Sequence, residues 1–205
     1  SKVVCGFEKP RSGVLELMGV DLGTLSIKER ADHIGYVMQN PNQMICETHI
    51  FDEVALGLRN RGIPEAQVKV RVEATLKICG LYPFRKWPVS ALSYGQKKRV
   101  TIASILALSP EMILLDEPTA FLDFPSKVET MRLLHRLAHE SGKTVFLSTH
   151  DLETAIQLSD DLWLLSADGL ESGTADSLSA DGSLERFVSC NGIRFDAARK
   201  VFYLS

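Results

Sequence analysis

From residue 112 onward, short apolar runs alternate with segments of helical spacing, and this alternation constrains the fold more than any other feature. Parallel strands need a crossover connection, which is usually a helix. The alternation therefore predicts an α/β fold in which helices cover the faces of a parallel sheet. The expected strands are residues 112–115, 145–148 and 162–165, and the expected helices between them are residues 126–139 and 152–158.

The first half of the chain predicts two further strands and several helices. Ser26 and Glu29 have the spacing of a capping box, which opens a short helix ahead of a strand at residues 34–38. After a loop rich in Asn, Gln and Pro, helical spacing at residues 50–59 and 65–79 predicts a helical subdomain inserted over about residues 40–92. The other expected elements are a strand at 14–18, a helix that ends at Leu108, and an appendage over 181–205 with a helix near 184–188 and a hairpin of 193–196 with 201–204.

Composition excludes several classes of protein. With 45% hydrophobic and 24% charged residues, the 205-residue chain has the balance of a folded globular domain. Its net charge of −3 gives no electrostatic reason to bind nucleic acid. No apolar stretch reaches the roughly 18 residues of a membrane span, and the first residues lack the features of a secretory signal, so we expect a cytoplasmic protein. The four cysteines have no paired short spacing, which predicts reduced and mostly buried thiols at Cys5, Cys46, Cys79 and Cys190.

Two adjacent carboxylates follow the most apolar of the predicted strands. Asp116 and Glu117 come directly after residues 112–115, at the carboxyl edge where open α/β sheets bind their ligands. An acid at this place can hold Mg²⁺ directly or through water, and the next acid can polarise a water molecule. Taken alone, such a pair is equally well explained as a helix cap or a solvated pair.

Two further segments point to a bound phosphate. His150 ends the next predicted strand, where a neutral imidazole can donate a hydrogen bond to a phosphate oxygen, although Thr149, His150 and Asp151 also fit a helix-capping cluster. Ser93-Tyr94-Gly95-Gln96 opens a helix whose backbone N–H groups can approach an anion. The bases that follow, Lys97, Lys98 and Arg99, have the alternative interpretation of a solvated helix face.

With these residues in place, the whole chain resembles the ATP-binding cassette (ABC) ATPases, which have a P-loop NTPase-like parallel sheet with an inserted α-helical subdomain. Five ordered motifs support the resemblance. They are the Q-loop glutamine Gln39 in Tyr36-Val37-Met38-Gln39, the signature Leu92-Ser93-Tyr94-Gly95-Gln96, the Walker B strand at residues 112–117, the D-loop Phe121-Leu122-Asp123, and the switch-histidine segment Ser148-Thr149-His150-Asp151.

The resemblance implies ATP and Mg²⁺ as cofactors and a head-to-tail pair of protomers. Asp116 would orient Mg²⁺, Glu117 would be the general base, His150 would contact the γ-phosphate, and Gln39 would sense the metal and the attacking water. The ATP bound by the second protomer would be contacted by Ser93, Gly95, Gln96 and Asp123. Phosphoryl transfer needs this kind of positioning and charge stabilisation rather than covalent chemistry.

The chain departs from the family pattern in two places. Tyr94 stands where the family usually has a second signature glycine, a change that we expect to be tolerated. No segment fits the Walker A P-loop, because Gly142-Lys143-Thr144 follows a helix and precedes a strand, and Leu137 occupies the place of the first glycine. The family places the P-loop just before Ser1, and residues 1–5 resemble the end of the helix that follows it. We therefore expect a single domain over 1–205, truncated at its amino terminus and inactive on its own.

The resemblance extends to importers of micronutrients. The first half is similar to the ATPases of energy-coupling-factor vitamin and cobalt importers, and the second half to those of iron-siderophore, haem and cobalamin importers. This implies transmembrane permease subunits as partners, a location on the inner face of the cell membrane, and a permease-contacting face that includes Glu53 and Arg59. A non-transport ATPase of DNA repair or translation, or a catalytically silent fragment, is the alternative. A metal pair at His135 and His139 is less favoured than a solvated helix face.

Overall fold

The computed structural model describes residues 2–167, 169–188, 193–196 and 201–204. The chain divides into two compact units, residues 1–148 and residues 149–205. The first unit contains a three-stranded parallel sheet in the order β3 (Ile34–Val37), β4 (Met112–Asp116) and β5 (Thr144–Ser148). This confirms the α/β class that the alternation of strands and helices predicted.

The central strand β4 is covered on both faces. Ile113, Leu114 and Leu115 are each at most 2% exposed, as expected of a central parallel strand with helices on both sides. Helix α4 (Tyr94–Ala107) packs closely on β3, because a Cβ at Gly35 would collide with the side chain of Ile105. The sheet therefore has a rigid interior, and its polar side chains lie where the strands end.

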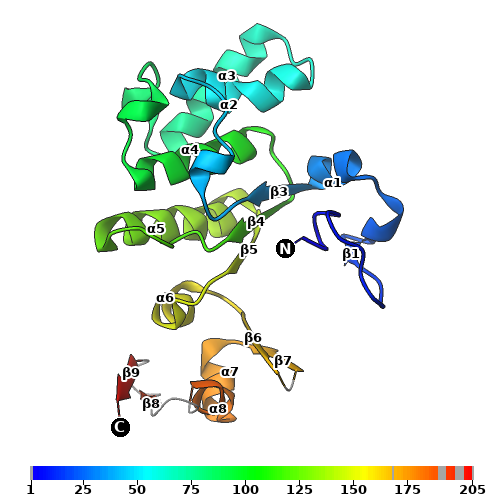
Figure 1. Cartoon of the computed structure of the whole chain (residues 1–205), viewed down its shortest axis with the longest axis vertical. Helices are drawn as coiled ribbons and strands as arrows, with labels where there is room; N and C mark the ends of the chain where they lie inside the picture. Colours follow the sequence, from blue (N-terminus) through cyan, green and yellow to red (C-terminus); the bar gives the residue numbers. More distant parts are fainter. Residues whose placement is uncertain (1, 168, 189–192, 197–200, 205) are drawn as a thin grey trace. The chain divides into compact units, whose positions relative to one another are not determined.

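The helices predicted at residues 50–59 and 65–79 are present. Helices α2 (Ile50–Asn60) and α3 (Glu65–Ile78) pack on each other and on α4, and Figure 1 shows the three side by side in cyan and green. Ile50 and Leu58 form part of this core, since each is at most 1% exposed. Short 3-10 turns complete the insertion: η2 (Pro41–Gln43), η3 (Tyr82–Phe84) and η4 (Val89–Ala91).

The first 33 residues form small elements around the sheet. The predicted strand at residues 14–18 is instead a hairpin of β1 (Glu16–Leu17) and β2 (Val20–Asp21), turned by Met18 and Gly19 in left-handed backbone conformations. The turn η1 (Leu22–Thr24) leads to α1 (Ile27–His33), which begins with the predicted capping box.

Residues 2–7 have the hydrogen bonds of a helix C-terminus. The Gly6 N–H donates to the Val3 carbonyl at 3.1 Å and the Phe7 N–H donates to the Lys2 carbonyl at 2.9 Å, with Gly6 in the left-handed region. This is the paired arrangement that ends many helices. It agrees with the prediction that Gly6 stops a helix at residues 1–5, of which Ser1 lies outside the described residues.

Helix α5 (Phe124–Ser141) crosses from the end of β4 back to the start of β5. It ends at Gly142, whose φ of 59° is the left-handed conformation of a helix C-cap. Gly142-Lys143-Thr144 thus follows a helix and precedes a strand, which confirms that it is not a P-loop. His135 and His139 are exposed on this helix with ring centroids 4.2 Å apart, as a solvated face predicts.

The second unit differs from the expectation in one strand and one helix. Strand β6 (Leu162–Ser166) pairs antiparallel with β7 (Gly169–Gly173), a strand that the sequence did not reveal, rather than extending the parallel sheet. Helix α7 (Ala175–Ala180) was also missed, whereas α6 (Leu152–Leu158), α8 (Ser183–Val188) and the hairpin of β8 (Ile193–Asp196) with β9 (Val201–Leu204) were predicted. The core of this unit comprises Ala155, Ile156, Leu162, Leu164, Ala175, Leu178 and Leu184.

The thiols agree with most of the prediction. Cys5 and Cys79 are buried and free, while Cys46 is free but exposed. Cys190 lies outside the described residues. Within the described part of the chain, no helix is long and apolar enough to span a bilayer.

Candidate nucleotide site

The carboxylate of Asp116 lies at the carboxyl edge of the sheet, where β4 ends. Its Oδ1 accepts a hydrogen bond from the Ser148 hydroxyl at 2.7 Å, and its Oδ2 lies 3.4 Å from the Tyr36 hydroxyl. The two donors come from the strands on either side of β4. The neighbouring strands therefore fix the orientation of the Asp116 side chain.

The next residue turns the chain sharply. Glu117 has a φ of 45°, in the left-handed region that costs a residue other than glycine about 1–3 kcal/mol. Its N–H donates to the Ser148 carbonyl at 3.0 Å, and its own carbonyl accepts from the Ala120 N–H at 3.2 Å. These bonds hold the strained turn at the ends of β4 and β5, so Glu117 leaves the strand beside Asp116 at the carboxyl edge of the sheet.

Gln39 lies on a loop that leaves the same edge. It follows β3 by two residues and its side chain is exposed. The Lys98 ammonium donates to the Met38 and Gln39 carbonyls, at 2.7 Å each. The hydroxyl of Tyr94 is 3.5 Å from the same Gln39 carbonyl. The backbone of Gln39 is therefore held by the helix that begins with the signature sequence.

Lys98 is fully buried, with 0% of its surface exposed. Burial lowers the pKa of its ammonium to about 8, and the nearby carboxylates of Asp116 and Glu117 oppose that shift. The interpretation of residues 97–99 as a solvated face is thus wrong for Lys98. It is also wrong for Arg99, whose side chain is 19% exposed and pairs with Glu129 at 3.3 Å.

The signature residues form the predicted helix start. Ser93 is the N-cap of α4: its hydroxyl accepts from the Gln96 N–H at 3.2 Å, while the Gln96 Oε1 accepts from the Ser93 N–H at 2.9 Å. The side-chain oxygen of Gln96, Oε1, therefore forms a hydrogen bond within its own helix start. An ATP contact through the remaining amide N–H donors of Gln96 stays a prediction.

Gly95 is required by packing inside the unit as well. A Cβ at this position would lie 2.8 Å from the Ser126 Oγ and 2.9 Å from the Ser126 Cβ, at the first turn of α5. The departure at Tyr94 is accommodated, because its ring packs edge-on against Phe121 with centroids 6.4 Å apart. The signature thus contacts the D-loop through Tyr94 and the first turn of α5 through Gly95.

Asp123 is the N-cap of α5. Its Oδ1 accepts from the Ser126 N–H at 3.0 Å, and hydrogen bonds from Ser126 lower the pKa of this exposed carboxyl group. Phe121, two residues earlier, has a φ of 62° and is 80% exposed. The D-loop therefore presents an apolar ring and a carboxylate at the surface.

His150 lies two residues beyond β5, at the start of the second unit. The Asp151 N–H donates to the Thr149 hydroxyl at 3.0 Å, and the Asp151 carboxylate accepts from the Thr154 N–H at 3.2 Å as the N-cap of α6. The capping interpretation of this segment is correct for Asp151. The contact of His150 with a γ-phosphate stays a prediction.

Sequence reasoning did not assign roles to Lys98, Ser148 or Tyr36. Lys98 had a usable signal, because it lies three residues after Gly95 and four before Ile102 on the buried face of α4. Ser148 had a weaker signal, since it ends the strand next to Asp116. In the described residues, no group of three or more His, Cys, Asp or Glu side chains forms a metal site.

Comparison with known families identifies this arrangement. The family model described as "ABC transporter" matches residues 1–120, more than half of the chain. The chain belongs to the ABC transporter family. The matched residues include Gln39, the signature and the pair Asp116 and Glu117. The family resemblance inferred from the motifs is thereby confirmed.

Curated relatives support the same family. A protein of Enterococcus faecalis named "Putative ABC transporter ATP-binding protein" is 57% identical over 157 residues, which cover 77% of this chain and 28% of the relative. A relative of the same name from Lactiplantibacillus plantarum is 52% identical over 160 residues, which cover 78% of this chain and 28% of that protein. The chain thus spans a little over a quarter of the length of these relatives.

Solved structures share the fold. The structure of cbiO1 from Clostridium perfringens, part of the ABC transporter complex cbiONQ, has a TM-score of 0.82 at 30% identity, and the match covers 92% of this chain and 76% of that one. The ATP-binding cassette MJ0796, in a dimeric post-hydrolysis state bound to ADP and Pi, has a TM-score of 0.72 at 29% identity and covers 85% and 78% of the two chains. The P-loop NTPase-like fold class is therefore correct.

Proposed function

We propose that this chain belongs to an ATP-hydrolysing subunit that powers an ABC importer of a micronutrient, such as a vitamin, cobalt or an iron complex. The observation that supports this most is the sheet edge, where Asp116 is oriented by both neighbouring strands and Glu117 follows it beside the Gln39 loop. The likeness to cbiO1, part of the complex cbiONQ, favours the energy-coupling branch of importers.

The donor set at the sheet edge fits Mg²⁺. The Asp116 carboxylate has acceptor capacity beyond its two hydrogen bonds, and Gln39 adds an amide oxygen on the adjoining loop. Mg²⁺ prefers oxygen ligands and is usually held by one or two carboxylates together with substrate phosphates and water. Asp116 and Gln39 would therefore hold the ion, which when bound neutralises charge on the phosphate oxygens.

Hydrolysis then depends on the residues around the γ-phosphate. Glu117 accepts a proton from the attacking water. The oxygen of that water bonds to the γ-phosphorus as the bond between the γ-phosphorus and the ADP oxygen breaks. Gln39 orients that water, and His150 donates a hydrogen bond to the γ-phosphate. General bases of this kind contribute on the order of 10²–10⁴-fold to a rate.

The site is completed by a second protomer in the head-to-tail pair. Ser93 and Asp123 are exposed at the starts of α4 and α5, where their side chains can reach an ATP molecule outside this chain. Gly95 and Gln96 lie in the same first turn as Ser93. The dimer of MJ0796 with bound ADP and Pi supports such an arrangement here.

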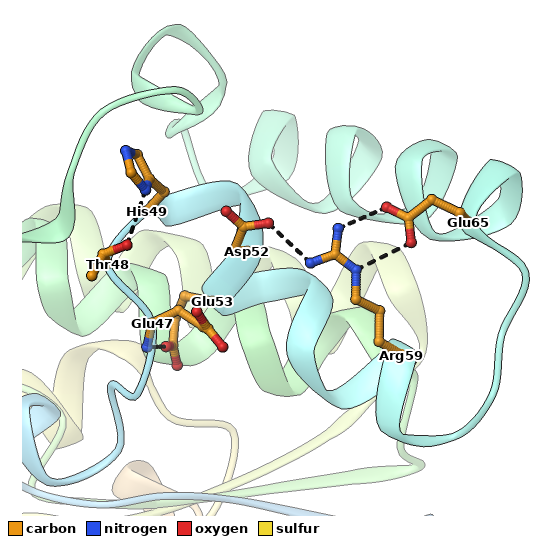
Figure 2. Close-up of polar contacts among 7 residues, drawn as sticks. All are labelled: Glu47, Thr48, His49, Asp52, Glu53, Arg59 and Glu65. Atoms are coloured by element: carbon orange, nitrogen blue, oxygen red, sulfur yellow. Dashed lines mark hydrogen bonds and ion pairs between the residues drawn. The ribbon is translucent and has the colours of Figure 1, made fainter.

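The permease subunits would contact the helical insertion. Figure 2 shows Arg59 between two carboxylates: its Nη1 lies 2.9 Å from Asp52, and its Nη2 lies 2.7 Å from Glu65. The hydrogen bonds that Arg59 donates to Glu65 and Asp52 raise the pKa of its guanidinium. A cleft of about 310 Å³ lies between the segments 42–48 and 88–90 and is lined by Ile45, Thr48 and Val89 among others. A cleft of this size takes a few side chains of a membrane partner rather than a whole helix.

The expectation that Glu53 belongs to this face is wrong. Glu53 is only 4% exposed, and its Oε2 accepts hydrogen bonds from the N–H groups of Cys46 and Glu47, at 2.8 Å each. Figure 2 shows this carboxylate turned towards Glu47. Reversing its charge would disrupt the insertion itself, so Arg59 is the residue with which to test permease contact.

ATP hydrolysis tests the proposal directly. ATPase activity is measured for this chain alone and for the chain extended at its amino terminus by a P-loop, each with Glu117→Gln as the matched variant. The extended wild type should hydrolyse ATP, and Glu117→Gln should bind ATP but lose on the order of 10²–10⁴-fold in kcat. A similar loss is expected for His150→Ala. Wild-type turnover in Glu117→Gln would remove the proposed base.

Transport tests the permease face. Arg59→Glu should lower uptake by the assembled importer while ATP binding stays at the wild-type level, because Arg59 lies in the last turn of α2 and is not among the residues proposed to bind ATP. Lys69→Glu, a charge reversal at an exposed position of α3, is the matched control. Equal uptake by both variants and the wild type would place the permease contact elsewhere.

A further inference from the structure

The loop that follows β3, residues 38–47, is held at both ends by buried charged side chains. At its start, the Lys98 ammonium donates to the carbonyls of Met38 and Gln39. At its end, the Glu53 carboxylate accepts from the N–H groups of Cys46 and Glu47. Both charged groups thus form hydrogen bonds with the backbone of the same loop. A buried charge is costly unless hydrogen-bonded, so these contacts keep the loop in one conformation.

The two charges belong to helices that pack on each other. Lys98 lies in α4 and Glu53 in α2, and the Ser104 hydroxyl of α4 is 3.4 Å from the Glu53 carbonyl. Two exposed contacts add to this connection, from Lys97 to the Asn42 side chain at 3.3 Å and from Tyr94 to the Gln39 carbonyl at 3.5 Å. The first turns of α4 therefore contact the loop at three successive points.

We propose that Lys98 is a positioning residue that fixes the backbone of Gln39 to the signature helix, so that α4 and loop 38–47 move as one body. The inference rests on the proposed ATPase function. Its consequence is that a displacement of the signature helix also displaces the Gln39 side chain, because the two are connected through the backbone of the loop. Lys98 acts through Gln39, because its ammonium is bonded to the Met38 and Gln39 carbonyls.

The geometry favours this role over simple core filling. Lys98 lies on the buried face of α4, where Gly95 and Ile102 flank it, so an apolar residue of similar length would fill the same volume. A lysine is needed only if its ammonium has acceptors, and both acceptors are carbonyls of the loop. The hydrogen bonds, rather than the volume, therefore explain the residue type.

Amide hydrogen exchange separates the two roles. The N–H groups of Gln43, Met44 and Ile45 are protected by bonds within the loop to Asn40 and Pro41. In Lys98→Met, which keeps the side-chain length, these amides should exchange at least about tenfold faster, while the amides of β4 and α3 keep their rates. Lys69→Met, at an exposed position of α3, is the matched control and should change neither set.

Kinetics of the P-loop-extended ATPase give the functional test. Lys98→Met should lower kcat by about tenfold or more with KM for ATP within about twofold, because Gln39 is misplaced while the nucleotide still binds. Uniformly faster exchange through the unit with unchanged kcat would show a structural role and overturn the proposal. Loss of activity in the wild type itself would count against the ATPase function, whereas the exchange result would still stand.

If Lys98→Met does not fold, a measurement on the wild type still tests the proposal. In a ¹⁵N–¹H spectrum of the chain, the protons of the Lys98 ammonium should be protected from exchange with solvent, because they are bonded to the Met38 and Gln39 carbonyls. An ammonium that exchanges as fast as that of Lys69 would overturn the proposal. Glu53→Gln should raise exchange at Cys46 and Glu47 while leaving the Lys98 signal unchanged.

Discussion

The end of β4 and the first turns of α4 each have adjacent residues of like charge, but the two runs are placed differently. Asp116 and Glu117 both lie half-buried at the edge of the sheet, beyond the apolar residues of their strand. In α4, Lys97 and Arg99 are partly exposed while Lys98 between them is completely buried. Successive helical residues point about 100° apart, so adjacent charged residues of a helix lie in different environments.

A run of like charges thus has a different meaning after a strand than within a helix. Two acids after an apolar strand share a location because the strand ends there. Three bases in a helix share only their sequence positions, and the one on the apolar face needs its own acceptors. Substitutions in α4 test this contrast.

The largest effect is expected from charge reversal in α4. Lys98→Glu should cost about 3–5 kcal/mol of unfolding free energy, because it places a buried carboxylate against two carbonyl oxygens. Lys97→Glu, the matched neighbour, should cost less than about 1 kcal/mol, because the Lys97 contact with Asn42 is exposed. Urea unfolding monitored by Trp87 fluorescence in a Trp163→Phe background measures both. Equal costs would contradict the contrast between the two lysines.

The second effect concerns the close contact between the signature and α5. Gly95→Ala should lower the unfolding free energy by about 1–3 kcal/mol, because the new Cβ meets Ser126 at under 3.0 Å. In a Ser126→Gly background the same substitution should cost markedly less. A cost that is independent of Ser126 would show that the contact does not limit residue 95.

The third prediction separates capping from nucleotide binding. Ser93 and Ser26 each form a complete capping box, at α4 and α1. Ser93→Ala and Ser26→Ala should each lower the unfolding free energy by about 1 kcal/mol. Only Ser93→Ala should also lower the ATPase rate of the P-loop-extended protein. If both variants hydrolyse ATP equally well, Ser93 is a helix cap without a nucleotide role.

Some of these structural features could be predicted from the sequence, and others could not. Both capping boxes, strand β4 and the end of α5 at Gly142 follow from local patterns, because caps and apolar runs depend on residues close in sequence. Strands β2 and β7 were missed because they are short or mostly exposed, without the alternation of buried and exposed residues that marks a strand.

The site divides in the same way. Asp116, Glu117 and Ser93 were predictable, since each follows or starts an element with a clear pattern. The contacts of Lys98 with Met38 and of Ser148 with Asp116 join residues 60 and 32 positions apart. Such pairs depend on how the strands and helices pack, so a local pattern does not contain them. Glu53 was misplaced on the surface for the same reason.

The smallest effect is a change of stability with pH. Burial raises the pKa of the Cys79 thiol to about 12, from an ordinary value of 9.0. The unfolded thiol therefore ionises first, and stability is full below the unfolded pKa and falls as pH rises towards the folded one. Between pH 8 and about 9.5 this loss amounts to about 0.8 kcal/mol. In urea unfolding over this pH range, the unfolding free energy of Cys79→Ala should fall by about 0.8 kcal/mol less than that of the wild type. An identical pH dependence in both proteins would contradict it.

The most direct test of the account is an experimental structure of the P-loop-extended Glu117→Gln protein with ATP and Mg²⁺. We predict that Asp116, residue 117 and His150 surround one triphosphate, closed on its far side by Ser93 of a second copy. A structure in which these side chains face separate surroundings, with the nucleotide bound away from the end of β4, would contradict the account.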